Sequence, residues 1–306
     1  MLLKQRVTVL TILNITWKNN LLIFGICVGV TIIDSLLMKK ATVPGTLPAL
    51  IGAALAFFIA FNNNQAYDRW WEARIIWGGL VNDSRSFSRA LLEYCSVPAD
   101  GSVTKEQIAV IQRRMIYRHL AFLYALKSAL RKSTDEDYKK FMSLEDTNLV
   151  TGKHNIAEAI LHLQSRDLEE LSSKKAIEGF RFLALNDLIR SFCDGMGKSE
   201  RIQNTVFPVT YIYFTEIIIW IFVGLTTMST SETLGPFWTI FFGWLVGFIF
   251  YNTHVNGLTL MNPFKLLPGG MPLDHITRTI EINFREALGE EYIPEPVEPV
   301  DGRYLL

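Results

Sequence analysis

Apolar residues along this chain gather into four stretches that are separated by strongly polar segments. A helix needs about 20 mainly apolar residues to cross a hydrocarbon core about 30 Å thick. The second stretch reaches that length if its helix starts near Pro44 and continues past Phe61, and the fourth is rich in the aromatic residues that suit a membrane interface. We therefore predict four membrane-spanning helices over Leu21–Met38, Leu47–Phe61, Val206–Met228 and Leu234–Phe250.

Between the second and third stretches the pattern changes to that of amphipathic helices. Thr104-Lys105-Glu106-Gln107 has the form of a capping box, in which two side chains satisfy free backbone N–H groups at a helix start. A further helix is predicted from about Arg166 to Met196, and Lys132–Lys140 is predicted to be a solvated loop. Behind the capping box, apolar residues recur at helical spacing, which predicts a core-facing stripe of Ile108, Ile111, Met115, Phe122, Leu126 and Leu130.

The segment from Asn262 onward carries one amphipathic helix, around Leu273–Leu288. It is followed by Ile293–Pro299, whose three prolines favour an extended path. Because no alternating strand pattern of convincing length occurs anywhere in the chain, the predicted fold class is an all-α integral membrane protein with a large helical cytoplasmic domain.

The distribution of Lys and Arg near the predicted spans indicates their orientation. Basic residues flank the N-terminal side and the middle segment, whereas the connection Ser229–Thr233 has none. Both termini and the middle segment are therefore predicted to be cytoplasmic. The predicted order is a cytoplasmic N-terminal segment (1–20), two spans with a pore neck (21–61), a cytoplasmic helical domain (62–205), two further spans (206–253) and a cytoplasmic helix with an extended tail (254–306).

Composition and motifs exclude several classes of function. The formal net charge is +0, which argues against nucleic acid as a partner, because phosphate contacts need a basic excess. The three cysteines are far apart, so a disulfide framework or a zinc site is not expected. HExxH, GxSxG, P-loop and GxGxxG motifs do not occur, so we expect no enzyme, no cofactor and no metal site.

The second predicted span carries the most informative pattern. Ala53, Phe57 and Phe61 stand four residues apart and share one helix face, which continues to Asn64 and Gln65. Several copies of such a helix around an axis would form a hydrophobic constriction that opens onto a wet vestibule. The alternative is that the rings pack against other spans, and on the pattern alone this is the more common role of such a stripe.

The segment from Phe61 to Arg74, FNNNQAYDRWWEAR, is followed by Trp77-Gly78 and resembles the signature after the second span of the bestrophin family, in particular its bacterial branch. Further motifs agree in order and spacing over nearly the whole chain. They are Glu200–Thr205 with Pro208 and Tyr211, Asn262-Pro263-Phe264, Pro272-Leu273-Asp274, Arg278–Glu281 and Leu288-Gly289-Glu290.

This resemblance implies a homopentamer with one axial pore in the bacterial inner membrane. Its partners would be copies of itself, membrane lipids and small inorganic ions, which it would conduct passively. The family's best-known members conduct chloride, so an anion is expected by analogy, although a cation fits the uncharged neck equally well. The resemblance places the neck at Ala53, Phe57 and Phe61, with an alanine where the family has a bulky residue. A second, cytoplasmic restriction falls near Phe180.

Eukaryotic bestrophins bind calcium through an acidic run after the Asn-Pro-Phe motif. Here Phe264 is followed by Lys265–Gly270, and no acid occurs before Asp274. Calcium requires several oxygen ligands, so we predict a channel without this calcium site.

Two other classes of function remain open at the level of sequence. A secondary transporter would be expected to show repeated halves with interrupted spans, and no such repeat is visible. A non-conducting membrane interaction protein would use Phe57 and Phe61 for packing only. Within the spans, Glu216 is expected to hydrogen-bond to a neighbouring span or at a subunit interface, and Asp34 is expected to have an exposed or capping role.

Overall fold

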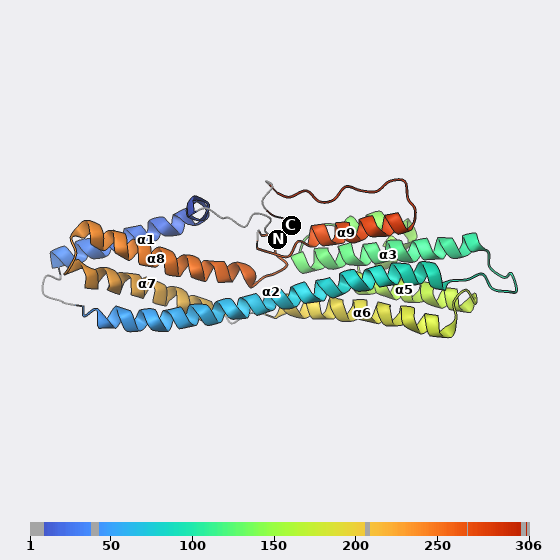
Figure 1. Cartoon of the computed structure of the whole chain (residues 1–306), viewed down its shortest axis with the longest axis horizontal. Helices are drawn as coiled ribbons and strands as arrows, with labels where there is room; N and C mark the ends of the chain where they lie inside the picture. Colours follow the sequence, from blue (N-terminus) through green and yellow to red (C-terminus); the bar gives the residue numbers. More distant parts are fainter. Residues whose placement is uncertain (1–8, 38–42, 206–208, 268, 301–303, 305–306) are drawn as a thin grey trace. The chain divides into compact units, whose positions relative to one another are not determined.

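The computed structural model describes residues 9–37, 43–205, 209–267, 269–300 and 304, and within these residues the chain is helical, with an isolated bridge between Val300 and Tyr304 as its only strand-like pairing (Figure 1). A short 3-10 helix covers Asp137–Phe141. The α-helices are α1 (Val9–Leu37), α2 (Thr46–Tyr94), α3 (Lys105–Arg131), α4 (Leu144–Val150), α5 (Ile156–Ser173), α6 (Gly179–Asn204), α7 (Val209–Ser231), α8 (Pro236–Leu260) and α9 (Leu273–Ala287). The predicted all-α class is confirmed.

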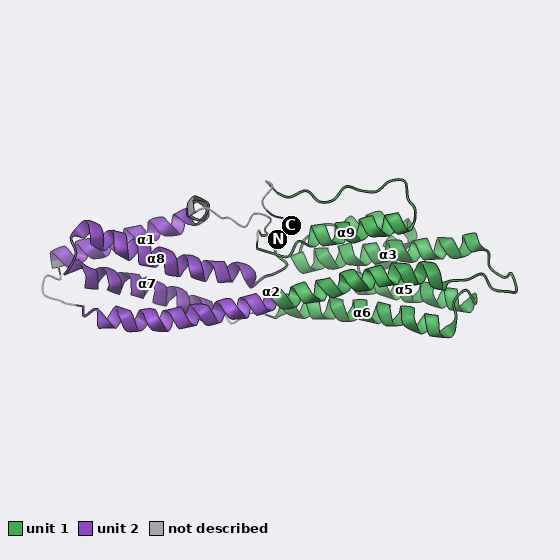
Figure 2. Cartoon of the chain, viewed as in Figure 1, with its two compact units in different colours: residues 1–3, 71–205, 264–306 green, residues 4–70, 206–263 purple. Residues whose placement is uncertain are grey.

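The chain divides into two compact units, which Figure 2 distinguishes by colour. Counted over described residues, unit 1 contains residues 71–205 and 264–304, and unit 2 contains residues 9–70 and 209–263. The boundary between Trp70 and Trp71 lies inside the continuous helix α2. The segment that begins at Phe264 therefore joins residues 71–205 in one unit, although α7 and α8 separate the two segments along the chain.

Unit 1 is built around α3, which packs against α5, α6, α9 and the 3-10 helix. Every member of the predicted apolar stripe of α3 is buried. The predicted capping box is also confirmed: the backbone N–H of Gln107 donates to Thr104 Oγ1 at 3.3 Å, and the backbone N–H of Thr104 donates to Gln107 Oε1 at 3.0 Å. The largest fully buried rings of this core are Trp77, Phe87, Phe122, Phe192, Phe264 and Phe284.

Unit 2 is an assembly of α1, α7, α8 and the first part of α2. Its core contains Ile23, Leu55 and Val223, while most of the large apolar side chains of these helices point outward. Glycines allow close helix contacts here. A Cβ placed on Gly247 of α8 would lie 2.6 Å from Cγ2 of Ile23 and 2.9 Å from Cγ2 of Val223. Small residues at helix interfaces are typical of membrane bundles, in which lipid supplies no hydrophobic force between helices.

Three of the described helices are long and apolar enough to cross a membrane, and they cover most of the first three predicted spans. Their apolar stretches lie in Thr16–Leu36, in Thr46–Tyr94 and in Val209–Ser231. The fourth predicted span, Leu234–Phe250, falls mainly in α8, which is not one of these three helices. The count of four spans stays a prediction. Met38 and Val206, at two predicted span ends, lie outside the described residues, as do the flanking Lys4, Arg6, Lys39 and Lys40.

Two sequence predictions in unit 1 are wrong. The helix predicted from Arg166 to Met196 is two helices, because α5 ends at Ser173 and α6 starts at Gly179 and continues past Gly197 to Asn204. Lys175, with a left-handed φ of 54°, lies in the turn between them. The segment Lys132–Lys140 is not simply a solvated loop, since it contains most of the 3-10 helix and its Tyr138 is buried. The charged residues on both sides of Tyr138 made this segment resemble an exposed loop in the sequence.

Candidate ion-conducting surface

One face of α2 in unit 2 is exposed in the single subunit although it carries large aromatic rings. Phe57 is 70% exposed and Phe61 is 49% exposed, and Ala53 on the same face is also exposed. The opposite face of α2 is buried through Leu55 and Ile59. The three predicted neck residues therefore share one outward face, and this face is distinct from the one that packs against α7 and α8.

Gly52 determines how closely the buried face of α2 approaches α7. A Cβ on Gly52 would lie 2.8 Å from Cε2 of Phe222, a distance that real Cβ contacts do not reach. The ring of Phe222 therefore occupies the space that any larger residue at position 52 would need. This contact holds the buried face of α2 against α7 and turns Ala53 and Phe57 outward.

The amide cluster that follows Phe61 separates into two pairs with different roles. Asn62 is buried, and its side-chain amide donates to Thr215 Oγ1 of α7 at 3.2 Å. The amide of Asn63 donates to the backbone carbonyl of Thr253 in α8 at 3.1 Å. Asn64 and Gln65 are exposed on the side of Phe61. The first pair thus anchors α2 to its neighbours, and only the second pair is available to line a vestibule.

Polar contacts also join the other helices of unit 2. The Ser231 hydroxyl at the end of α7 donates to Asp34 Oδ2 of α1 at 2.5 Å, so Asp34 joins two helices. The Tyr251 hydroxyl of α8 hydrogen-bonds to Glu216 of α7, which agrees with the prediction that this acid would contact a neighbouring helix. Both acids are therefore held by hydroxyl groups from a second helix, an arrangement that lowers the cost of placing a charge there.

The residue predicted for the cytoplasmic restriction lies at the start of α6 in unit 1. Phe180 is 87% exposed, and Leu183, one turn later on the same face, is also exposed. A phenylalanine this exposed has no packing role within its own subunit. The sequence did not predict that Leu183 would extend this apolar surface, although its spacing of three residues was a readable signal.

Unit 1 contains a buried polar core that the sequence analysis did not identify. His119 is fully buried among aromatic rings, and its Nε2 lies 2.9 Å from Ser84 Oγ. Ser84 Oγ also lies 2.5 Å from the carbonyl oxygen of Leu80, so this hydroxyl contacts both the imidazole and the helix backbone. Burial lowers the pKa of His119 to about 3, so the ring is neutral at physiological pH.

Buried ion pairs also join α3 to α4 and α5. The guanidinium of Arg118 contacts Asp146 at 2.6 Å and Asp167 at 2.5 Å, and all three side chains are almost completely buried. Arg114, one helical turn away, adds a second contact to Asp167 at 2.6 Å. Within the described residues, no three His, Cys, Asp or Glu side chains are arranged to hold a metal ion. These charges therefore pair with one another and organise the fold.

The segment at which eukaryotic relatives would bind calcium has a different arrangement here. Asp274, the first acid after Phe264, contacts Lys127 at 2.9 Å and Arg131 at 2.7 Å. Burial raises the pKa of this carboxyl group, but the hydrogen bonds from the two cations outweigh it, and the net pKa is lowered. The charge of Asp274 is thus already neutralised within the fold. The absence of a calcium site stays a prediction.

The chain is similar to a known protein family and to several of its members. Residues 5–286 match the family model for "Bacterial/Fungal Bestrophin protein". A voltage-dependent anion channel-forming protein of Mesorhizobium japonicum is 29% identical over 260 residues, covering 84% of this chain and 78% of the relative. The voltage-dependent anion channel-forming protein YneE of Escherichia coli K12 is 27% identical over 259 residues, covering 84% of this chain and 81% of the relative.

Among solved structures, a crystal structure of a bacterial bestrophin homologue from Klebsiella pneumoniae has a TM-score of 0.80 at 22% identity. The match covers 89% of this chain and 98% of that structure. A second crystal structure, of a membrane protein that carries a single substitution, gives a TM-score of 0.81 at 21% identity, covering 90% of this chain and 100% of that one. At this level of identity the likeness establishes the shared fold.

Proposed function

The chain belongs to the bacterial and fungal bestrophin family, and we propose from this premise that five copies of it form an ion channel around one axial pore. It is a bacterial membrane protein. We propose that the protein is a passive channel and not an enzyme. We further propose that Ala53, Phe57 and Phe61 line its neck, that Asn64 and Gln65 line the adjoining vestibule, and that Phe180 forms a second restriction.

The observation that carries this proposal is the exposed aromatic face of α2. Exposed Phe57 and Phe61 share their face of α2 with the exposed amides of Asn64 and Gln65. Facing lipid would be unfavourable for the amides, and facing bulk water would be unfavourable for the rings. A narrow aqueous path accommodates both, since apolar rings can gate water and amides can hydrate an ion. Phe180 and Leu183 give unit 1 a similar unpaired apolar surface at the start of α6.

Two observations support anions as the conducted species. Both relatives described above are named voltage-dependent anion channel-forming proteins. Phe180 is the second residue of α6, and the N-terminus of a helix carries a partial positive charge that favours anions. Glu178 at the N-cap position makes no side-chain capping hydrogen bond, so it leaves the first free N–H groups of α6 available.

For the membrane topology we propose four spans, with α8 as the fourth, both termini in the cytoplasm and unit 1 on the cytoplasmic side of the inner membrane. Cys193 is exposed on α6 and offers a direct test. A membrane-impermeant maleimide should label it in inverted vesicles and not in intact spheroplasts. Labelling in spheroplasts alone would contradict this orientation.

The test of function is a planar-bilayer recording of the purified channel in asymmetric NaCl. A reversal potential near that of chloride is expected. Phe57→Ala should raise the single-channel conductance severalfold, because it widens the neck. Phe58→Ala is the matched control, since Phe58 is 41% exposed on the same helix but points about 100° away, and its conductance should stay within a factor of two.

The other outcomes separate the competing functions. A reversal potential near that of sodium would establish a cation channel and contradict anion selectivity. Silence of the unmodified protein, when its pentameric size has been verified, would favour a transporter or a non-conducting protein. Equal effects of Phe57→Ala and Phe58→Ala would contradict the assignment of Phe57 to the neck.

A further inference from the structure

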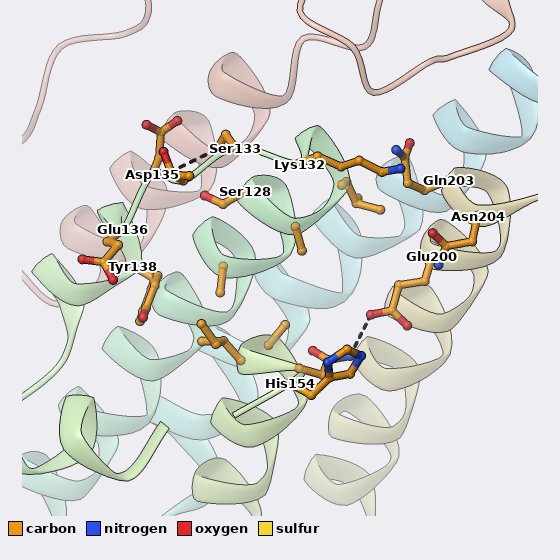
Figure 3. Close-up of a pocket in the computed structure, with 17 residues that line it drawn as sticks. Ser128, Lys132, Ser133, Asp135, Glu136, Tyr138, His154, Glu200, Gln203 and Asn204 are labelled. Atoms are coloured by element: carbon orange, nitrogen blue, oxygen red, sulfur yellow. Dashed lines mark hydrogen bonds between the residues drawn. The ribbon is translucent and has the colours of Figure 1, made fainter. Parts of the chain in front are cut away.

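Unit 1 contains a cavity of about 670 Å³ at the place where the ends of α3 and α6 meet the start of α5 (Figure 3). This volume is in the range of sites for small organic ligands and is far larger than a single metal ion requires. The walls come from the last turn of α3, the loop after it, Asn155 at the start of α5, and Glu200, Gln203 and Asn204 at the end of α6. None of these residues belongs to the proposed neck or restriction.

The cavity wall carries charged side chains of both signs. Figure 3 shows Lys132 extending toward Gln203, while Asp135 and Glu136 lie across the cavity from it. Glu200 lies lower, next to His154. Among the described residues, Lys132, Asp135 and Glu200 are not members of any ion pair, so their charges are available to a ligand. Glu136 is partly neutralised by Lys139 at 2.6 Å.

Glu200 is held in place by a residue that itself has a structural role. The side chain of Asn155 caps α5, because its Oδ1 accepts the backbone N–H of Glu158 at 3.1 Å. The other end of the same amide donates to Glu200 Oε1 at 2.8 Å. The carboxylate is therefore oriented before any ligand arrives, and such preorganisation lowers the entropic cost of binding.

Two helix ends also line the cavity. The helix carbonyl ends at Arg131 of α3 and Asn204 of α6 add partial negative charge, which favours a cation.

We propose that this cavity binds a small zwitterion with a primary ammonium group at one end and a phosphate or carboxylate at the other. The carboxylate of Glu200 receives the ammonium group. Lys132 and the amide of Gln203 receive the anionic group. The ethanolamine phosphate unit has this chemistry, and it occurs both as a soluble compound and as the headgroup of a phospholipid.

Isothermal titration calorimetry with phosphoethanolamine, on the purified full-length channel in detergent, tests the proposal. We expect saturable binding with one site per subunit. Glu200→Gln keeps the oxygen that Asn155 contacts but removes the charge, and it should weaken the Kd at least tenfold. Lys132→Met should do the same. Ethanolamine alone and inorganic phosphate alone, as half-ligands, should each bind at least tenfold more weakly than phosphoethanolamine.

Matched controls separate loss of the site from loss of the fold. Glu169→Gln removes an exposed acid of α5 that does not line the cavity. Lys175→Met removes a lysine with the same left-handed backbone as Lys132, with φ of 54° against 53°. Both controls should bind phosphoethanolamine as the unmodified channel does. All variants should elute at the size of the unmodified channel.

A second experiment, with the channel in lipid nanodiscs, distinguishes a phospholipid headgroup from a soluble compound as the ligand. If the site takes a lipid headgroup, discs that contain phosphatidylethanolamine should reduce phosphoethanolamine binding, and discs of phosphatidylcholine should not. If neither disc reduces binding, the ligand is the soluble compound. The proposal is overturned if phosphoethanolamine does not bind in detergent, or if it binds equally to Glu200→Gln, Lys132→Met and the unmodified channel. These outcomes do not depend on ion conduction, so they are distinguishable from failure of the channel proposal.

Discussion

The two units of this chain are both all-helical, but different interactions hold their helices together. In unit 1, interlocking apolar side chains surround paired charges, such as Arg118 with Asp146 and Asp167. In unit 2, the large apolar side chains point outward and the helices meet at glycines such as Gly52 and Gly247. The difference follows from the solvent, because water drives apolar groups inward whereas lipid does not. Close backbone approach replaces the hydrophobic effect in the second unit.

The largest test of this contrast removes the buried cation of unit 1. Arg118→Met leaves Asp146 and Asp167 buried, with Arg114 as the only remaining contact for Asp167. Uncompensated buried charges cost about 3–5 kcal/mol, so we expect the free energy of unfolding of unit 1 to fall by about that amount. Chemical denaturation in detergent, followed by circular dichroism, measures it.

Arg190→Met is the control for this test, because the ion pair of Arg190 with Asp187 is exposed. Surface pairs contribute about 0–1 kcal/mol, and little change is expected. If Arg118→Met and Arg190→Met lowered the free energy of unfolding equally, the buried ion pairs would be no more important for unit 1 than the exposed ones.

A second test uses the buried imidazole of unit 1. The pKa of His119 is about 3 in the folded protein and 6.5 in an unfolded chain, so between these values the unfolded state binds one proton more. Stability is therefore complete above pH 6.5 and falls as the pH drops from 6.5 toward 3, by about 1.4 kcal/mol per pH unit from this group. Unfolding free energies measured at about pH 7 and about pH 5 should differ by about 2 kcal/mol on its account.

His119→Phe removes the titrating group and retains an aromatic ring against Phe87 and Phe192. Ser84 keeps its hydrogen bond to Leu80, so the substitution leaves no new hydroxyl donor unsatisfied. The difference in stability between these two pH values should shrink by about 2 kcal/mol in this variant. An unchanged difference would mean that other groups cause the acid sensitivity.

The smallest effect concerns helix contact in unit 2. Gly247→Ala places a methyl group against Ile23 and Val223, and overpacking of this kind costs about 1–3 kcal/mol. Alanine has a higher helix propensity than glycine, which offsets part of the packing cost. We therefore expect the free energy of unfolding to fall by about 1 kcal/mol, which would be seen as a lower melting temperature in detergent. Gly224→Ala has open space around its new methyl group and should not lower the melting temperature. A tolerated Gly247→Ala would contradict close packing at this contact.

Local signals in the sequence were sufficient for part of this structure. The capping box at Thr104 and the apolar stripe of α3 were correct because each depends only on residues within a few helical turns. The division between α5 and α6 was missed because the turn at Lys175 contains no glycine or proline, and a lysine there adopts a backbone conformation that sequence does not reveal.

The candidate site shows the same limit. The spacing of Phe57 and Phe61 was sufficient to predict that they share one face of α2. Their exposure in the single subunit did not follow from it, because on the pattern alone packing against other spans is the more common role of such a stripe. The separation of Asn62 and Asn63 from Asn64 and Gln65 did not follow, because it depends on contacts with α7 and α8, which lie far away in the chain. Burial of His119 and the cavity around Glu200 likewise depend on contacts between distant helices.

The left-handed backbone at Lys132 has a consequence for protein engineering. A lysine with φ of 53° stores about 1 kcal/mol of strain that glycine would release, so Lys132→Gly is a natural choice for making the protein more heat-resistant. The same change would remove the only lysine in the cavity wall. A screen that selects for melting temperature alone would therefore enrich variants that no longer carry the binding chemistry, whereas the equivalent glycine at Lys175 would give the same gain without that loss.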